Sequence, residues 1–271
     1  MALRRVLPDT NVCYPISLLD LMLRLDEASL HEIIWTEDLL VELEDTWVGH
    51  GIRTRADARR VCDDIRAAFV GQDVPRAEYE HLITAMPGSD PDDHVHAAAA
   101  VARAPTTIVT ENVRDFPTEP MTALGVRVCR PDEYLSEVFE EEPDEVIRIV
   151  GNMAADRRRP PMTAADVLTA LERAGATRFV GRVRLTSWDT VDGARWRRRA
   201  MSVKDSHASN PTRISSRSCA LSTAPAMLGP PTVRRSGLPG HHDRSVATTV
   251  GTHPVSDIKQ AVEKVKDGLK R

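Results

Sequence analysis

The chain has 271 residues, of which 41% are hydrophobic and only 4% aromatic, and its formal net charge is −4. This length predicts one large domain or two small ones, and the hydrophobic content is enough for a buried core of mostly aliphatic side chains. No apolar run approaches the roughly 20 residues that span a bilayer, and the negative net charge excludes a uniformly basic nucleic-acid-binding coat.

The cysteines and the N-terminus indicate where the protein resides. The four cysteines, Cys13, Cys62, Cys129 and Cys219, are far apart and form no C-x-x-C pair. This spacing argues against a zinc ribbon or a disulfide scaffold and is typical of a reducing cytoplasm. The apolar segment near the N-terminus is too short for a signal-peptide core. We therefore expect a cytoplasmic protein with no membrane segment.

Strands and helices alternate along the first 140 residues. We predict strands at residues 3–7, 30–35, 106–110 and 126–129. Helices are expected after Pro15, after the capping residues Thr36 and Thr54, from Asp92 or Asp93, and over residues 131–139. Because strands alternate with helices, we predict an α/β fold with a central parallel sheet and helices on both faces.

The composition changes near residue 185. Residues 1–184 carry 33 acidic and 21 basic side chains, whereas residues 185–256 carry 4 and 10 and are rich in Ser, Thr, Pro and Gly. Such a segment buries too little apolar area to offset its ordering entropy. We predict a helical extension at 141–184, a disordered basic segment at 185–256 and a short amphipathic helix at 257–271. The basic segment, through Arg195 to Arg199, is either an RNA-binding arm or an appended extension with no role.

Acidic side chains follow the predicted strands. Asp9 comes directly after the first strand, Glu42 lies on the helix after the second, and Asp115 follows the 106–110 strand by five residues; Asp92 and Asp93 open a helix. Sites in open α/β sheets form beyond the carboxyl ends of the strands, so these acids are expected to gather there. Each acid alone also fits a structural role, such as a helix cap.

Gathered carboxylates repel one another and resist ionisation unless a cation neutralises them. A few oxygen ligands with retained waters suit Mg²⁺, and such an ion lowers the pKa of an attacking water and stabilises charge on a phosphate. The pattern therefore favours phosphodiester hydrolysis. A haloacid-dehalogenase phosphatase is disfavoured, because Asn11 stands where that class needs a second Asp. A histidine metal site is also disfavoured, because His94 and His96 are two apart on a helix.

Four motifs resemble those of the PIN domain, in particular the VapC-type ribonuclease toxins of type II toxin–antitoxin systems. They are Val6-Leu7-Pro8-Asp9-Thr10-Asn11-Val12, Thr36-x-x-Leu39-Leu40-x-Glu42-Leu43, Asp90-Pro91-Asp92-Asp93-His94-Val95 and Ile108-Val109-Thr110-Glu111-Asn112-x-x-Asp115-Phe116. The resemblance implies a PIN domain at 1–140 with an α/β/α sandwich. It also implies Mg²⁺- or Mn²⁺-dependent endoribonuclease activity, an RNA substrate, a cognate antitoxin and a homodimer. Residues 160–179 resemble the helical C-terminal extension of some longer PIN proteins.

The resemblance also assigns roles to particular residues. Asp9 and Asp93 match the metal-binding acids, and Glu42 and Asp115 match the acids that complete the catalytic pocket. Polar positions that hold the acids and a water match three further residues, Asn11, Thr110 and Asn112. Two alternatives stay open: Asp92 in place of Asp93, and Glu44 in place of Glu42, because Glu44 lies nearer the centre of the apolar helix face.

An acidic pocket repels RNA, so basic side chains must help to bind it. The candidates are Arg4, Arg5, Arg53, Arg55, Arg59, Arg60 and Arg114. The alternative function is a PIN-type module that binds RNA or protein without catalysis.

Overall fold

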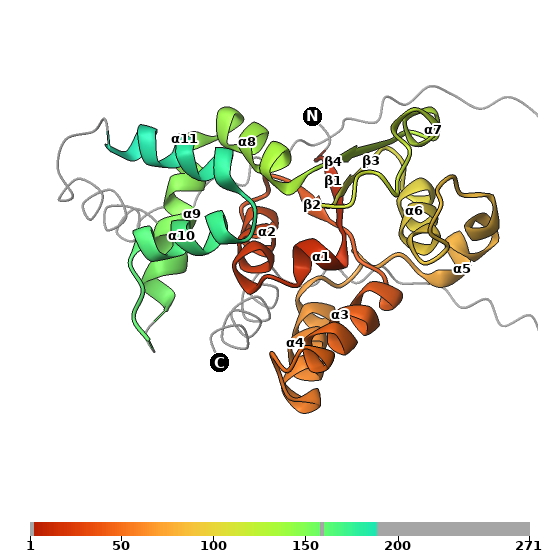
Figure 1. Ribbon diagram of the computed structural model, residues 1–271, viewed down its shortest axis with the longest axis horizontal. Coiled ribbons are helices and arrows are strands. Elements are labelled where there is room, and N and C mark those ends of the chain that lie inside the picture. The colour runs from red at the N-terminus through yellow and green to blue at the C-terminus, as the bar shows by residue number, and fades with distance from the viewer. Residues whose placement is uncertain (1–2, 158–159, 189–271) are drawn as a thin grey trace, which may run out of the picture.

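The computed structural model describes residues 3–157 and 160–188 (Figure 1). The first four residues of the predicted basic segment, 185–188, form the last turn of a helix. The rest of that segment and the predicted helix at 257–271 lie outside the described residues.

A four-stranded parallel sheet forms the centre of the molecule. Its strands are β1 (Arg5–Pro8), β2 (Glu32–Ile33), β3 (Thr106–Val109) and β4 (Val126–Cys129). They lie in the order β2-β1-β3-β4, and every neighbouring pair is parallel. The predicted α/β class with a parallel sheet is therefore confirmed.

The edge strand is shorter than its apolar sequence predicts. We expected a strand over residues 30–35, but β2 has two residues, and Trp35 pairs instead with Asp73 in an isolated bridge. The backbone N–H of Ile33, which faces away from β1, donates to the carboxylate of Asp26 at 2.6 Å. The chain leaves the sheet after Ile34, so sheet pairing ends there even though the apolar run continues.

Helices cover both faces of the sheet (Figure 1). Because side chains alternate along a strand, Val6 and Val109 enter one core and Leu7 and Ile108 enter the other. The larger core includes α2 (Ile16–Glu27), α3 (Glu37–Gly49), α4 (Arg55–Ala68) and α8 (Pro131–Glu141). The smaller core includes α5 (Arg76–Tyr79), the 3-10 helix η1 (Glu80–Ala85), α6 (Asp93–Ala102) and α7 (Thr118–Ala123). The layers therefore form an α/β/α sandwich.

Local capping signals fix where several helices begin. The hydroxyl of Thr36 accepts from the N–H of Leu39 at 3.0 Å at the start of α3, and Thr54 caps α4 in the same way. These two predicted caps are confirmed. A capped helix has a defined first residue, so α3 presents its acidic residues in a fixed register toward the edge of the sheet.

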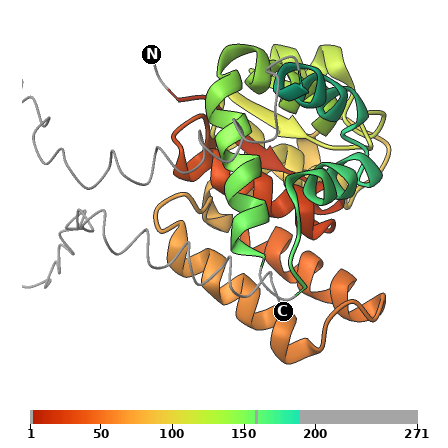
Figure 2. The same ribbon diagram turned by 90° about the vertical axis from the view of Figure 1, so that its left-hand side faces the viewer.

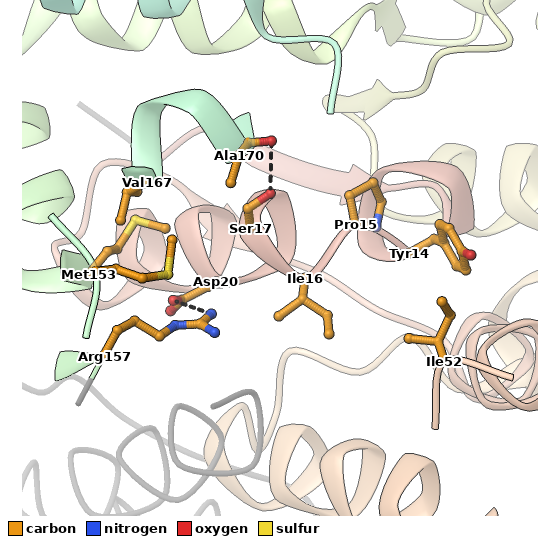
Figure 3. Close-up of a pocket in the computed structure, with 11 residues that line it drawn as sticks. Tyr14, Pro15, Ile16, Ser17, Asp20, Ile52, Met153, Arg157, Val167 and Ala170 are labelled. Atoms are coloured by element: carbon orange, nitrogen blue, oxygen red, sulfur yellow. Dashed lines mark hydrogen bonds and ion pairs between the residues drawn. The ribbon is translucent and has the colours of Figure 1, made fainter. Parts of the chain in front are cut away.

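Three helices extend the fold after α8. They are α9 (Pro143–Asp156), α10 (Ala164–Arg173) and α11 (Thr177–Trp188). Their apolar side chains belong to the larger core, and Figure 2 shows them on the side of the molecule that faces the viewer. Two polar contacts also tie them to α2: Ser17 donates to the carbonyl of Ala170 at 3.4 Å, and Arg157 lies 3.5 Å from Asp20 (Figure 3). No helix within these described ranges is long and apolar enough to cross a membrane.

The shared core predicts that the extension and the sheet unfold together. Phe179 on α11 is fully buried, and its ring meets that of Phe139 on α8 edge-to-face, with ring centroids 6.1 Å apart. Phe179→Ala is expected to lower the free energy of unfolding by about 3–5 kcal/mol in a single urea transition. Leu185→Ala is the control, because Leu185 is exposed on the same helix. A separate early transition for the extension would contradict the shared core.

Candidate active site

Asp9 lies at the carboxyl end of β1 and caps the short helix α1 (Thr10–Cys13). Its side chain is almost fully buried, so its carboxylate needs hydrogen-bond donors. Three are present: the N–H of Thr10 at 2.7 Å, the amide of Asn11 at 2.5 Å and the hydroxyl of Thr110 at 2.6 Å. An ionised carboxylate has about four acceptor positions, so one remains for a further ligand.

The polar residues predicted to support the acids form one network. Thr110 follows β3, which neighbours β1, and its hydroxyl accepts from the amide of Asn11 at 3.1 Å and from the N–H of Asn112 at 2.9 Å. The side-chain oxygen of Asn11 accepts from the N–H of Glu111 at 3.1 Å. The network joins the ends of two adjacent strands and holds the Asp9 carboxylate in one orientation.

Asp93 is the first residue of α6 and lies in the field of the other acids. The pKa of its carboxyl is raised to about 6, mainly by burial and also by the carboxylates of Asp9, Asp90 and Asp115, while His96 lowers it. Neighbouring Asp92 is exposed, and its side chain makes no capping hydrogen bond. Of the two adjacent aspartates, Asp93 is thus the one that is electrostatically coupled to Asp9.

A glycine allows the loop that carries Asp115 to approach the start of α6. Gly88 has φ +137°, and a Cβ built on it would lie 2.6 Å from the backbone carbonyl oxygen of Asp115. Any other residue there would be strained and would push the two loops apart. This close approach brings Asp115 near enough to Asp93 to raise its pKa.

Glu42 lies on α3 and reaches across to α6. Its carboxylate is 3.0 Å from Nε2 of His96, and this hydrogen bond lowers the pKa of Glu42. Glu44, the alternative, is buried on the same helix and forms salt bridges with Arg55 at 3.3 Å and Arg59 at 3.5 Å. The charge of Glu44 is therefore neutralised by two arginines of α4, whereas the side chain of Glu42 is directed to the helix that carries Asp93.

Sequence reasoning missed two neighbours of the acids. The first is His96, whose spacing from His94 argues against a shared metal site. In the structure, His96 is the hydrogen-bond partner of Glu42. The available signal was its position three residues after Asp93, which places both on one face of α6. Asp90 is the second, because its charge adds to the burial that raises the pKa of Asp93.

The donor set fits a hard divalent cation that keeps several of its waters. Asp93 resists ionisation because it is partly buried and because its neighbours are carboxylates, and a bound cation relieves the second of these conditions. Among the described residues, no group of three or more His, Cys, Asp or Glu side chains is close enough to enclose a metal ion. One or two carboxylates completed by waters and substrate phosphates are what Mg²⁺ prefers, so Asp9 and Asp93 suit it better than a zinc-type ion.

One pocket of the described residues lies away from the acids of the site. A cavity of about 380 Å³ is lined by the α1–α2 junction, including Tyr14 and Ile16, and by Met153 and Val167 of the extension (Figure 3). None of the acids of the site lines it. It is mainly apolar, which suits neither a phosphate nor a divalent cation. The acidic site therefore remains the candidate active site.

The parallel sheet, the α/β/α layers and the acids at the carboxyl edge together define a PIN-like fold. Residues 131–185 match the family model described as the VapC50 C-terminal domain. Over 93 residues the chain is 31% identical to "Putative ribonuclease VapC50" of Mycobacterium tuberculosis (strain ATCC 25618 / H37Rv), a match that covers 34% of this chain and 54% of the relative. Over these two stretches the chain is similar to VapC-type proteins. Its match spans about half the length of that relative, and no solved structure matches it.

Proposed function

We propose that the chain is a metal-dependent endoribonuclease that hydrolyses RNA phosphodiester bonds, and that it is the toxin of a toxin–antitoxin pair. The observation that carries the proposal is the convergence of Asp9, Asp93 and Asp115 from three segments of the chain: burial and the neighbouring carboxylates together raise the pKa of Asp93 to about 6. The name of the curated relative, a ribonuclease, supports the same activity.

In this proposal, each residue of the site has a separate role in hydrolysis. Asp9 and Asp93 would hold Mg²⁺, or Mn²⁺ in its place, and Asn11 and Thr110 keep the Asp9 carboxylate in one orientation. Such an ion would supply a water of lowered pKa and positive charge beside the phosphate oxygens. Asp115, whose charge acts on Asp93, and Glu42, which is bonded to His96 of the same helix, would orient the water. Glu42 is kept ionised by its hydrogen bond from His96, so it can accept a hydrogen bond from that water.

The activity is tested by incubating the purified chain with total RNA in Mg²⁺, in excess chelator, and in chelator followed by Mn²⁺. We expect cleavage with either metal and none with the chelator alone. The competing proposal, a binding module without catalysis, requires RNA binding with and without metal and no cleavage in any condition.

One basic side chain near the acids remains available for RNA. Six of the seven candidate arginines already contact the protein: Arg4, Arg5, Arg55, Arg59 and Arg60 form salt bridges, and Arg53 lies over the ring of Trp47. Arg114 is exposed, stands beside Asp115 and forms no salt bridge with any residue in 3–157 or 160–188. It is therefore the best-placed contact for a phosphate next to the scissile bond.

Arg114→Ala is expected to weaken RNA binding several-fold and to reduce the slope of log K against log salt by about 0.7–1, the effect of one lost phosphate contact. Binding is measured by fluorescence anisotropy in chelator, so that no RNA is cut. The control is Arg66→Ala, because Arg66 is already paired with Glu37 and Asp63. An unchanged salt slope in Arg114→Ala would remove Arg114 from the RNA-binding surface.

A cognate antitoxin and a homodimer are part of the same proposal. Light scattering on the purified chain measures its oligomeric state, and the gene beside its own is expected to encode a small, basic DNA-binding protein. Co-expression of that neighbour is expected to suppress cleavage, and failure to do so would remove the toxin role while leaving the ribonuclease.

A further inference from the structure

His96 is a buried imidazole whose polar contact points to the acidic site. The residue is only 4% exposed and lies on α6 among alanines. Its Nε2 is 3.0 Å from Glu42 of α3, and its buried Nδ1 has no hydrogen-bond partner in the described part of the chain. The hydrogen bond to Glu42 is thus what its ring contributes beyond packing.

The direction of this hydrogen bond follows from the state of Glu42. The hydrogen bond from His96 lowers the pKa of Glu42, so Glu42 is ionised near neutral pH and can only accept. Nε2 of His96 must therefore carry a proton whether the ring is neutral or charged. The ring acts on Glu42 as a donor, and the tautomer of the neutral form is set by that carboxylate.

The side chains of Glu42 and His96 differ in conformational freedom. About half of the Glu42 side chain is exposed, so without a partner it would sample several rotamers over the surface of α3. The ring of His96 is confined by burial, and it lies three residues after Asp93 on the same helix. A rigid donor on the helix of Asp93 can therefore hold a mobile carboxylate of α3 at a fixed distance from the acids.

We propose that His96 is a positioning residue: by donating from Nε2, it holds the Glu42 carboxylate beside Asp9 and Asp93 in the orientation that hydrolysis needs. This role rests on the proposed ribonuclease activity. It differs from a packing role, because a side chain that only fills space needs no donor and no Glu42.

The test compares steady-state cleavage by wild type, His96→Ala, His96→Gln, Glu42→Gln and the His96→Ala, Glu42→Gln double variant. His96→Ala is expected to lower kcat by about 10–100-fold with little change in KM, as for other residues that orient a site carboxylate or ligand. His96→Gln keeps an N–H donor at a similar reach and is expected to recover most of the loss. In the Glu42→Gln background, His96→Ala is expected to have no further effect.

The control is His94→Gln, because His94 is two residues away on α6 and its ring contacts the carbonyl of Gly88 rather than an acid of the site. It is expected to cleave RNA at close to the wild-type rate. Additive losses in the double variant, or a His96→Gln variant no more active than His96→Ala, would overturn the positioning role and leave a packing role.

A second readout does not depend on cleavage. Nuclear magnetic resonance titration of the histidine ring nitrogens is expected to show that His96 loses its proton at lower pH in Glu42→Gln than in wild type, because the negative partner is gone. An unchanged titration would show that the pair does not form in solution. If wild type cuts no RNA with any metal, the proposed function fails and the positioning role fails with it, while this titration still decides whether the pair exists.

Discussion

Asp9→Asn is expected to abolish metal-dependent RNA cleavage while the chain remains folded. The substitution keeps the size of the side chain but removes the negative charge that the proposed mechanism needs to bind a dication. The expected loss exceeds the roughly 10–100-fold typical of residues that only support a metal ligand. The amide also replaces one acceptor oxygen of the network with Asn11 and Thr110, so a destabilisation of about 1–3 kcal/mol is expected as well.

Cleavage rate and far-ultraviolet circular dichroism are measured on the same preparation. Asp92→Asn is the matched control, because Asp92 is exposed and next to Asp93. It is expected to cleave RNA normally, and its inactivation would assign the metal to Asp92 instead of Asp93. Full metal-dependent activity in Asp9→Asn would contradict the proposed mechanism.

Asp93→Asn is expected to be inactive and, in the absence of metal, more stable than wild type above pH 6. In the folded state the pKa of Asp93 is raised to about 6, above the unfolded value of 3.8, so folding disfavours its charge. Wild type and variant should be similarly stable below about pH 4, and wild type should lose stability relative to the variant as the pH rises through 6.

The shift corresponds to an upper limit of about 3 kcal/mol, and solvent screening of this partly buried group reduces it to about 1 kcal/mol. For a folded body of this size, that is about 2–4 °C in Tm. Thermal unfolding is followed from pH 4 to pH 8 in chelator and again in Mg²⁺, which is expected to raise the Tm of wild type only. A variant that is less stable than wild type at pH 8 in chelator would show that the acids do not repel.

The sequence predicts those parts of the fold and site that depend on neighbouring residues and on the order of strands and helices. Asp9 follows a strand, Thr36 caps a helix, and parallel strands bring their carboxyl ends to one edge, so the convergence of Asp9 and Thr110 follows from topology. The helix predicted from Asp92 or Asp93 likewise has a local cause, and α6 begins at Asp93. Each of these needs only the order of elements and the chemistry of one or two neighbouring residues.

What sequence could not supply depends on where side chains of distant segments meet. Helical periodicity placed Glu44 nearer the apolar face, and Glu44 is indeed buried; its neutralisation by Arg55 and Arg59 depends on the packing of α4 against α3. The pairing of Glu42 with His96 joins residues 54 positions apart through the angle between two helices. The early end of β2 likewise involves a distant segment, because Trp35 pairs with Asp73 instead of continuing along β1.

Diffraction from crystals soaked in Mn²⁺, with anomalous difference maps, tests the ion-binding role of Asp9 and Asp93 most directly. A peak is predicted between these two side chains, about 2.0–2.3 Å from a carboxylate oxygen of at least one of them and within one water of the other. Absence of the peak at millimolar Mn²⁺, or carboxyl groups that lie more than about 10 Å apart, would contradict a shared ion.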